Sequence, residues 1–307
     1  MRRRVTVVLA GGLGNQLFQY FAGFYVAHMN KSSLKLDSTF SKAGSPTAPV
    51  WLDVLQLPAS GVRSSPKNAL KILVATVRRA TRGALARLMG TQERQLKFLR
   101  QYRSSDVGYD SNVELLRPPV TLIGYFQTWR FYESLKSAGV APELKMKKVS
   151  EWYLETSDLL DRQGRVLGLH IRKGDYVGNP KIGNLSPSYY EEAVRALRNN
   201  LVDWDAIWIF SDDVLAARNE LSSLLDNLSN VYFVDPPDHS HSFESLSLMS
   251  KTSALVIANS TYSWWAATLG EPSRPIVCPD KWFFQMEDPS DLCPPDWIRA
   301  EASWSHR

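Results

Sequence analysis

The chain has 307 residues, of which 44% are hydrophobic, and carries a net charge of +5. A chain of this length can bury one large core or two ordinary ones, and the usual domain size favours two. Its two cysteines, Cys278 and Cys293, are too few for a disulfide framework or a cysteine metal site, and they suit a reducing compartment. No internal repeat or low-complexity tract is present, which excludes the repeat architectures.

The first predicted elements lie in residues 5–27, which contain no charged side chain and follow three arginines. A membrane anchor or a secretion signal begins in the same way. However, the apolar run covers residues 5–10 only, and the glycines and amides that follow would be costly inside a membrane. The pattern instead predicts a buried strand, a glycine turn and a helix with apolar side chains at helical spacing. We therefore expect a cytoplasmic chain.

The next expected elements are a strand over 34–37, loops to about residue 66, and a strand within 120–129. Between them, residues 67–103 contain ten Lys or Arg and one acid, so this segment carries +9 and the remainder of the chain −4. It predicts a basic amphipathic helix, which would suit an anionic membrane surface such as the inner membrane. The alternative is a surface helix whose apolar side packs on its own domain. Nucleic-acid binding is not expected, because no recognisable module accompanies the charge.

The second half predicts alternating strands and helices after a domain boundary near residue 150, so that the domains are 1–150 and 151–307. Such alternation is typical of a doubly wound parallel sheet. The expected strands are 165–172, 206–212, 231–235, 254–260 and 275–280, and the expected helices are 187–200, 214–225, 241–250 and 263–270.

Ligands of doubly wound sheets bind at the carboxyl ends of the strands. Three polar segments stand at those ends: 170–176 (HIRKGDY), 211–213 (SDD) and 259–261 (NST). Arginine, hydroxyls and helix-start N–H groups favour a phosphate, and a carboxylate pair can hold ribose hydroxyls or a base edge. The combination predicts a nucleoside diphosphate site. Each segment alone has an ordinary explanation, since Ser and Asp commonly cap helices.

Two other ligand patterns fit less well. Gly12 and Gly14 with Asp37 resemble an NAD fingerprint, but Leu17 stands where the third glycine belongs. The Asp-X-Asp sequence at 203–205 has a form that holds a divalent ion, yet it precedes a strand and would not reach the ligand edge. No metal or other cofactor is therefore expected, and Arg172 and Lys173 with helix-start donors would neutralise a leaving diphosphate.

Five segments carry a family resemblance, and they occur in the family's order along nearly the whole chain. They are GGLGNQLFQY (11–20), GYFQTWRFY (124–132), HIRKGDY (170–176), FSDD (210–213) and NSTYSWWAA (259–267). The set resembles the α-1,2-fucosyltransferases of glycosyltransferase family 11. The first and third segments are also similar to those of the wider fucosyltransferase superfamily. The resemblance implies an α/β fold of the GT-B type, with two Rossmann-like domains facing a cleft, GDP-fucose as donor, inversion at the anomeric carbon and no metal.

The resemblance also implies roles for individual residues. Arg172 would bind the diphosphate and stabilise the charge that leaves with GDP, and Asn15 would reach across the cleft towards the reacting centre. Apart from the resemblance, the chemistry calls for a general base, and Asp175 of the motif is a candidate. The alternative role of Asp175 is to brace Arg172 and the turn. A third alternative has no base, so that the departing phosphate takes the proton. The implied donor-binding residues are His170, Lys173, Asp212, Asp213, Asn259, Ser260, Thr261 and Ser263.

Lys173 departs from the usual motif, which has a second arginine at this position. A lysine keeps the positive charge but loses the planar fork that binds two oxygens at once. We expect activity to survive if the position contributes charge alone. If the usual arginine clamps two oxygens there, the donor preference changes.

The implied activity is transfer of L-fucose from GDP-β-L-fucose to the 2-hydroxyl of a galactoside, through an oxocarbenium-like transition state. The acceptor would be an oligosaccharide or a lipid-linked glycan in surface-glycan synthesis. Two alternatives stay open at this point. One is a GT-B transferase of another linkage or another GDP-sugar, and the other is a basic membrane-peripheral binding protein with a vestigial nucleotide pocket.

Overall fold

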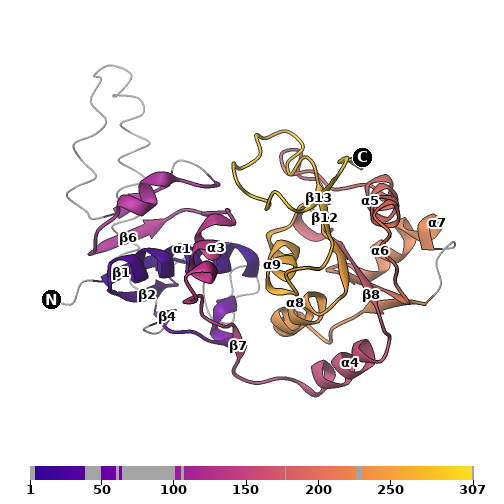
Figure 1. Ribbon diagram of the computed structural model, residues 1–307, viewed down its shortest axis with the longest axis horizontal. Helices are drawn as coiled ribbons and strands as arrows, with labels where there is room; N and C mark the ends of the chain where they lie inside the picture. Colours follow the sequence, from indigo (N-terminus) through magenta and orange to yellow (C-terminus); the bar gives the residue numbers. More distant parts are fainter. Residues whose placement is uncertain are drawn as a thin grey trace. The chain divides into compact units, whose positions relative to one another are not determined.

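The computed structural model describes residues 4–38, 50–59, 62–63, 101–104, 107–176, 178–225 and 230–305 (Figure 1). The chain divides into two compact units, of which the first comprises Met1–Met146 with Pro289–Asp291 and the second comprises Lys147–Asp288 with Leu292–Arg307. The segment Pro289–Asp291 thus groups with the first unit, although we expected it in the second. The expected basic helix lies outside the described residues, except that 101–103 form a strand.

The first unit contains a parallel sheet with the strand order β4-β2-β1-β6-β5. Its members are β1 (Arg4–Val8), β2 (Ser33–Asp37), β4 (Val62–Arg63), β5 (Gln101–Arg103) and β6 (Val120–Ile123). The strands expected near residue 5, at 34–37 and within 120–129 are confirmed. Apolar and β-branched residues dominate β1 and β6, as is typical of the buried strands of a parallel sheet.

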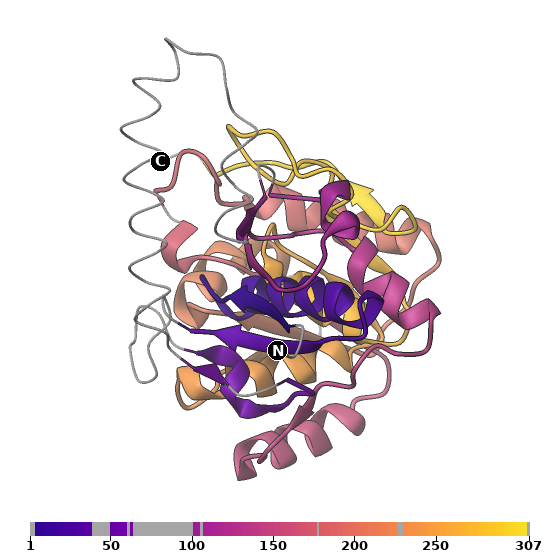
Figure 2. The ribbon, with the colours of Figure 1, turned by 90° about the vertical axis from the view of Figure 1, so that its left-hand side faces the viewer.

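Helix α1 (Leu13–Met29) follows β1 after a glycine turn and packs along it (Figure 2). Gly11 has a φ of +77°, a conformation that favours glycine. Two fully buried amides complete the turn: Gln16 Nε2 donates to the Gly11 carbonyl (3.0 Å), and Gln19 Oε1 accepts from the Ala10 N–H (2.9 Å). The strand, turn and helix expected from the sequence are confirmed, and the polar residues of this apolar helix satisfy backbone groups.

The first unit also contains shorter helices and strands. Aromatic side chains join α1 to α3, with ring centroids 4.7 Å apart for Phe21 and Tyr132. The further elements are η1 (Trp51–Val54), β3 (Leu55–Gln56), η3 (Ser111–Leu115), α3 (Arg130–Ser137) and β7 (Lys145–Met146), and β3 pairs antiparallel with β7. None of the helices that the structure describes, α1 included, is long and apolar enough to cross a bilayer.

The second unit contains a parallel sheet with the strand order β10-β9-β8-β11-β12-β13. Its strands are β8 (Val166–Ile171), β9 (Ala206–Ser211), β10 (Val231–Val234), β11 (Ala254–Val256), β12 (Ile276–Pro279) and β13 (Ile298–Ala300). The alternating pattern of this half is confirmed as a doubly wound sheet. The strand β13 is an addition that the sequence analysis did not predict.

The helices of the second unit connect these strands. They are α4 (Glu151–Asp161), η4 (Gly174–Tyr176), α5 (Pro187–Asn199), α6 (Val214–Glu220), α7 (Ser222–Leu225), η5 (His239–His241), α8 (Ser242–Ser250) and α9 (Thr261–Leu269). The single helix expected over 214–225 is divided into α6 and α7, and α4 was not predicted. The two tryptophans of α9, Trp264 and Trp265, are fully buried in the core.

A buried arginine fixes the end of α9. Arg274 is 7% exposed, and its guanidinium donates to the carbonyls of Thr252 (2.9 Å) and Ala266 (2.5 Å). Burial lowers the pKa of Arg274 to about 10, which leaves it charged at neutral pH. A cation at a helix C-terminus is stabilised by the carbonyls there, so Arg274 fastens α9 to the segment that follows α8.

Gly23 generates a prediction about the packing of α1 on β1. A Cβ at this position would lie 2.1 Å from Cγ2 of Val7, which is itself fully buried. We expect Gly23→Ala to lower the free energy of unfolding by about 1–3 kcal/mol through overpacking, measured by urea denaturation. In a Val7→Ala background the added methyl has room, so the same change should cost less there. Equal losses in the two backgrounds would contradict the close approach of helix and strand.

Candidate functional site

The carboxyl ends of three neighbouring strands form the candidate site, and we call them the rim. Its segments are 170–176 after β8, 211–213 after β9 and 259–263 after β11. The strands β9, β8 and β11 are adjacent and parallel, with Ile171 level with Ser211 across the first pair. The sheet therefore brings the three polar segments to one edge of the second unit.

Arg172 lies at the centre of the rim and is partly exposed. Its Nη1 is 2.8 Å from Oδ2 of Asp212, and its guanidinium lies 5.1 Å from the ring centre of Tyr176. The other oxygen of Asp212 accepts from the N–H of Lys173 at 2.8 Å. Asp212 thus holds both the guanidinium and the backbone of the turn, which is the bracing role that the sequence left open for Asp175.

The turn after Arg172 depends on a glycine. Gly174 has a φ of +34°, and a Cβ there would lie 2.3 Å from Oδ2 of Asp212. Any larger residue would displace the carboxylate that pairs with Arg172. Asp175 follows in η4, and its side chain lies outside the described part of the structure.

Lys173 differs from the expectation that it adds charge to the diphosphate pocket. Its side chain is 3% exposed, and its amine forms an ion pair with Glu220 at the end of α6. When the Asn184 amide is oriented to satisfy both of its neighbours, its oxygen accepts from Lys173 Nζ (2.9 Å) and its nitrogen donates to the Arg172 carbonyl (2.7 Å). The amine therefore points into the fold. Glu220 and Asn184 supply the partners that a buried charge requires.

His170 is buried near the carboxyl end of β8. Its pKa is lowered to about 3, first because burial disfavours the charged imidazolium and second because Arg172 carries a nearby positive charge. Its Nδ1 is buried without a hydrogen-bond partner among the described residues, and its ring centre lies 5.6 Å from that of Tyr262. The rim therefore contains a neutral imidazole beside a cationic guanidinium.

Most of the polar side chains after β11 satisfy the fold itself. Asn259 is buried and donates to the Trp282 carbonyl at 3.1 Å. Ser263 donates to the Ser260 carbonyl at 3.2 Å, and Ser260 caps α9 by accepting from the N–H of Tyr262 at 3.3 Å. Thr261, the first residue of α9, is partly exposed. Of the four residues expected here to bind the donor, Asn259, Ser260 and Ser263 have partners within the fold.

The residues after β9 are similarly engaged. Asp213 caps α6, since its Oδ1 accepts from the N–H of Ala216 at 2.9 Å. Its own N–H donates to Oγ of Ser211 at 3.1 Å. Helix capping is the ordinary explanation that the sequence analysis kept open for this carboxylate. Asp213 remains exposed, so capping leaves its second oxygen accessible to solvent.

The Asp-X-Asp sequence lies away from the rim. It precedes β9 and so stands at the amino end of the sheet. Asp205 accepts from the backbone N–H of Arg165 at 2.8 Å, and Asp203 lies 3.9 Å from the same arginine's guanidinium. Both carboxylates therefore stabilise the start of β8 and β9.

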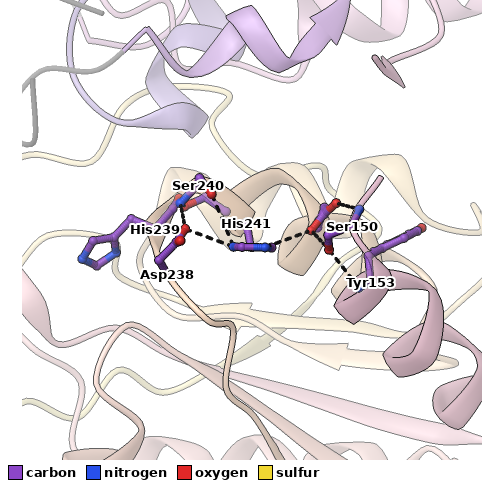
Figure 3. Close-up of polar contacts among 8 residues, drawn as sticks. Ser150, Tyr153, Asp238, His239, Ser240 and His241 are labelled. Atoms are coloured by element: carbon purple, nitrogen blue, oxygen red, sulfur yellow. Dashed lines mark hydrogen bonds and ion pairs between the residues drawn. The ribbon is translucent and has the colours of Figure 1, made fainter. Parts of the chain in front are cut away.

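A polar network beyond β10 was missed by the sequence analysis (Figure 3). His241 Nδ1 lies 3.0 Å from Oδ1 of Asp238, and its Nε2 lies 4.0 Å from Glu244. Glu244 is largely buried and accepts from both the N–H (2.6 Å) and the hydroxyl (2.7 Å) of Ser150, the cap of α4. The network fastens α4 to α8. The sequence PPDHSHSFES gave no local signal for it, since its partner lies 94 residues earlier.

In the first unit, Asn15 occupies the first turn of α1 and is partly exposed. Its Oδ1 accepts from Nε2 of Gln127 at 2.9 Å, which fixes the orientation of its amide group. Gln127 is buried, and Phe126 before it has a φ of +54°, a strained conformation for an aromatic residue. The segment 124–132, noted for its resemblance, supports Asn15 through this bond, and the contact was not predicted.

Comparisons with known proteins identify the family of the chain. The family model described as glycosyl transferase family 11 matches residues 122–298. An α-1,2-colitosyltransferase from Escherichia coli is 28% identical over 312 residues, which covers 97% of this chain and 99% of that protein. The O-antigen biosynthesis glycosyltransferase WbnK, also from E. coli, is 29% identical over 307 residues and covers 94% and 98%.

The fold also matches solved structures at low sequence identity. Fucosyltransferase NodZ from Bradyrhizobium is 14% identical, with a TM-score of 0.52 over 90% of this chain and 97% of that one. A variant of Arabidopsis thaliana FUT1 in complex with GDP is 14% identical, with a TM-score of 0.54 over 91% and 70%. These likenesses show the GT-B fold. Because the family model covers more than half of its length, the chain belongs to glycosyltransferase family 11.

Proposed function

We propose that the chain transfers L-fucose from GDP-β-L-fucose to the 2-hydroxyl of a galactoside, with inversion and without a metal ion. The observation that carries the proposal is the partly exposed guanidinium of Arg172, held at the carboxyl ends of the strands by Asp212. A fixed guanidinium can bind two phosphate oxygens at once and stabilise charge that develops on a leaving diphosphate. Membership of the family supports this donor class.

The other rim residues divide into donor contacts and supports. We assign Thr261, at the start of α9, to the phosphates, because helix-start N–H groups and hydroxyls bind anions. Asp213, with one oxygen facing solvent, is assigned to the guanosine end. His170 lines the pocket as a neutral ring. These roles leave Asp212, Asn259, Ser260 and Ser263 as supports that hold the donor contacts in place.

The acceptor hydroxyl must lose a proton as it attacks the anomeric carbon. We assign this proton to Asp175, which lies in the same turn as Arg172, or to the phosphate of the departing GDP. Asn15 of the first unit donates a hydrogen bond from its amide nitrogen at the reacting centre, since its amide oxygen already accepts from Gln127.

A second sugar donor follows from one relative. The E. coli α-1,2-colitosyltransferase aligns with 97% of this chain, and colitose is L-fucose without its 3-hydroxyl group. GDP-linked colitose is therefore the alternative donor. A lipid-linked glycan is the acceptor class that the basic segment 67–103 favours, through attraction to an anionic membrane.

The first prediction concerns the nucleotide. We expect calorimetry to show micromolar GDP binding and at least tenfold weaker binding of UDP and ADP. Arg172→Ala should weaken GDP binding by about 30-fold or more, because it removes a phosphate contact and leaves Asp212 unpaired. Arg195→Ala, which removes an exposed arginine of α5, is the matched control and should bind GDP normally. Equal affinity for all three nucleotides would refute the transferase and favour a vestigial pocket.

The second prediction concerns the transfer step. Incubation with GDP-fucose or GDP-colitose and a panel of soluble and lipid-linked β-galactosides should give a new α-1,2 bond, located by NMR. Asn15→Asp keeps the oxygen that accepts from Gln127 but replaces the donating nitrogen. We expect it to reduce the transfer rate about 100-fold while GDP affinity stays within about twofold. A bond to another hydroxyl would replace the proposed linkage, and a parallel loss of GDP affinity would argue against a role for Asn15 in transfer.

The third prediction concerns pH. The folded pKa of His170, about 3, lies below its ordinary value of 6.5, so the unfolded chain binds one more proton between these values. His170 therefore stabilises the fold fully above pH 6.5, and this contribution is lost as the pH falls towards 3. Between pH 7 and pH 4.5, wild-type protein should lose about 2–3 kcal/mol more unfolding free energy than His170→Gln. His239→Asn, at an exposed histidine, is the control, and identical pH slopes for wild type and His170→Gln would contradict the buried neutral ring.

A further inference from the structure

Lys173 presents an unexpected arrangement for the residue next to a phosphate-binding arginine. Its side chain is 3% exposed, and its amine contacts Glu220 and the Asn184 amide. A lysine that binds a diphosphate keeps its ammonium group at the ligand surface. Here two acceptors, Glu220 and Asn184, hold the ammonium inside the fold instead.

Three contacts connect Lys173, through its amine and its backbone N–H, to Arg172. The Asn184 amide that accepts from Lys173 also donates to the Arg172 carbonyl at 2.7 Å. The backbone N–H of Lys173 donates to Asp212 at 2.8 Å, and Asp212 holds the guanidinium of Arg172 at 2.8 Å. The anchored lysine therefore fixes both the backbone of Arg172 and the carboxylate that orients its side chain.

Electrostatics makes this anchor a coupled unit. Removing one partner of a buried ion pair leaves an uncompensated charge, whereas replacing both partners by neutral groups is often tolerated. Glu220 is the last residue of α6, and its side chain is 39% exposed. The lysine of the pair is therefore buried, whereas the carboxylate is in contact with solvent. Without Glu220, Asn184 would be the remaining acceptor of the ammonium group among the described residues. The ammonium group would then move towards water or another anion and displace the turn that contains Arg172.

We propose that Glu220 and Asn184 are positioning residues, which act through Lys173 to hold Arg172 for the donor diphosphate. This inference rests on the proposed function. It assigns the Lys173 amine to the fold and not to a phosphate. It also explains why lysine can replace the second arginine of the usual motif, because the position needs only a cation that reaches Glu220.

The direct-ligand account of Lys173 makes the opposite predictions. If the amine bound phosphate, neutralising Glu220 would free it, and GDP would bind equally well or more tightly. Losing the amine would weaken GDP binding whatever residue stands at 220. A double-mutant cycle over Lys173 and Glu220 separates the two accounts.

The experiment measures GDP affinity by calorimetry for wild type, Glu220→Gln, Lys173→Met and the double variant. We expect each single change to weaken binding about tenfold, and the double variant to bind no more weakly than either single variant, because the two residues act through one ion pair. Glu192→Gln, at an exposed ion pair of α5, is the control and should bind as wild type does. Unchanged or tighter GDP binding by Glu220→Gln, or losses that add to about 100-fold in the double variant, would overturn the proposal.

Two further readouts separate positioning from general damage. Guanosine, followed by saturation-transfer NMR, should bind all variants equally, because it lacks the phosphates that Arg172 contacts; a collapsed pocket would lose guanosine and GDP together and overturn the proposal. If Lys173→Met does not fold, Glu220→Gln and Lys173→Arg decide, with a tenfold loss expected for the first and near-normal binding for the second. Wild-type protein without a preference for GDP over UDP and ADP would refute the proposed function itself, before any variant is compared.

Discussion

The ion pair between Arg172 and Asp212 is the interaction on which the site depends. It joins residues that follow two neighbouring strands, β8 and β9, so it forms only because the sheet sets these strands side by side. Asp212 uses its second oxygen to hold the N–H of Lys173, which fixes the turn as well as the side chain. A cation that is held in advance loses little conformational freedom when an anion binds, and it can act on charge as that charge develops.

Most of the polar atoms near Arg172 serve the fold. Asn259 and Ser263 bind carbonyls, Asp213 caps a helix, and Lys173 is paired inside the domain. Buried polar groups are costly without partners, so these residues meet their needs within the chain. Among the described residues of the rim, the guanidinium of Arg172 is the dominant positive charge, because the Lys173 ammonium is paired inside the fold and the His170 ring is neutral. A rim whose polar groups are mostly satisfied within the chain is therefore also rigid.

In the first unit, neutral polar side chains likewise find their partners within the chain. Its glycine turn is held by the buried amides of Gln16 and Gln19, and Asn15 is oriented by Gln127. Each amide bonds to a backbone group or to another amide, which rigidifies the start of α1 without adding charge. Further along the helix, the absence of a side chain at Gly23 lets α1 approach Val7 of β1 closely.

The sequence by itself determined the elements and their order, because strand and helix periodicities and glycine turns are local properties. From this alternation followed the doubly wound sheet and the convergence of 170–176, 211–213 and 259–261 on one edge. Tertiary structure alone decided which side chains at that edge find their partners within the chain. Glu220 lies 47 residues from Lys173, and Gln127 lies 112 residues from Asn15. No local pattern records such pairings, since a polar side chain turns towards whichever partner the folded backbone brings within hydrogen-bonding distance.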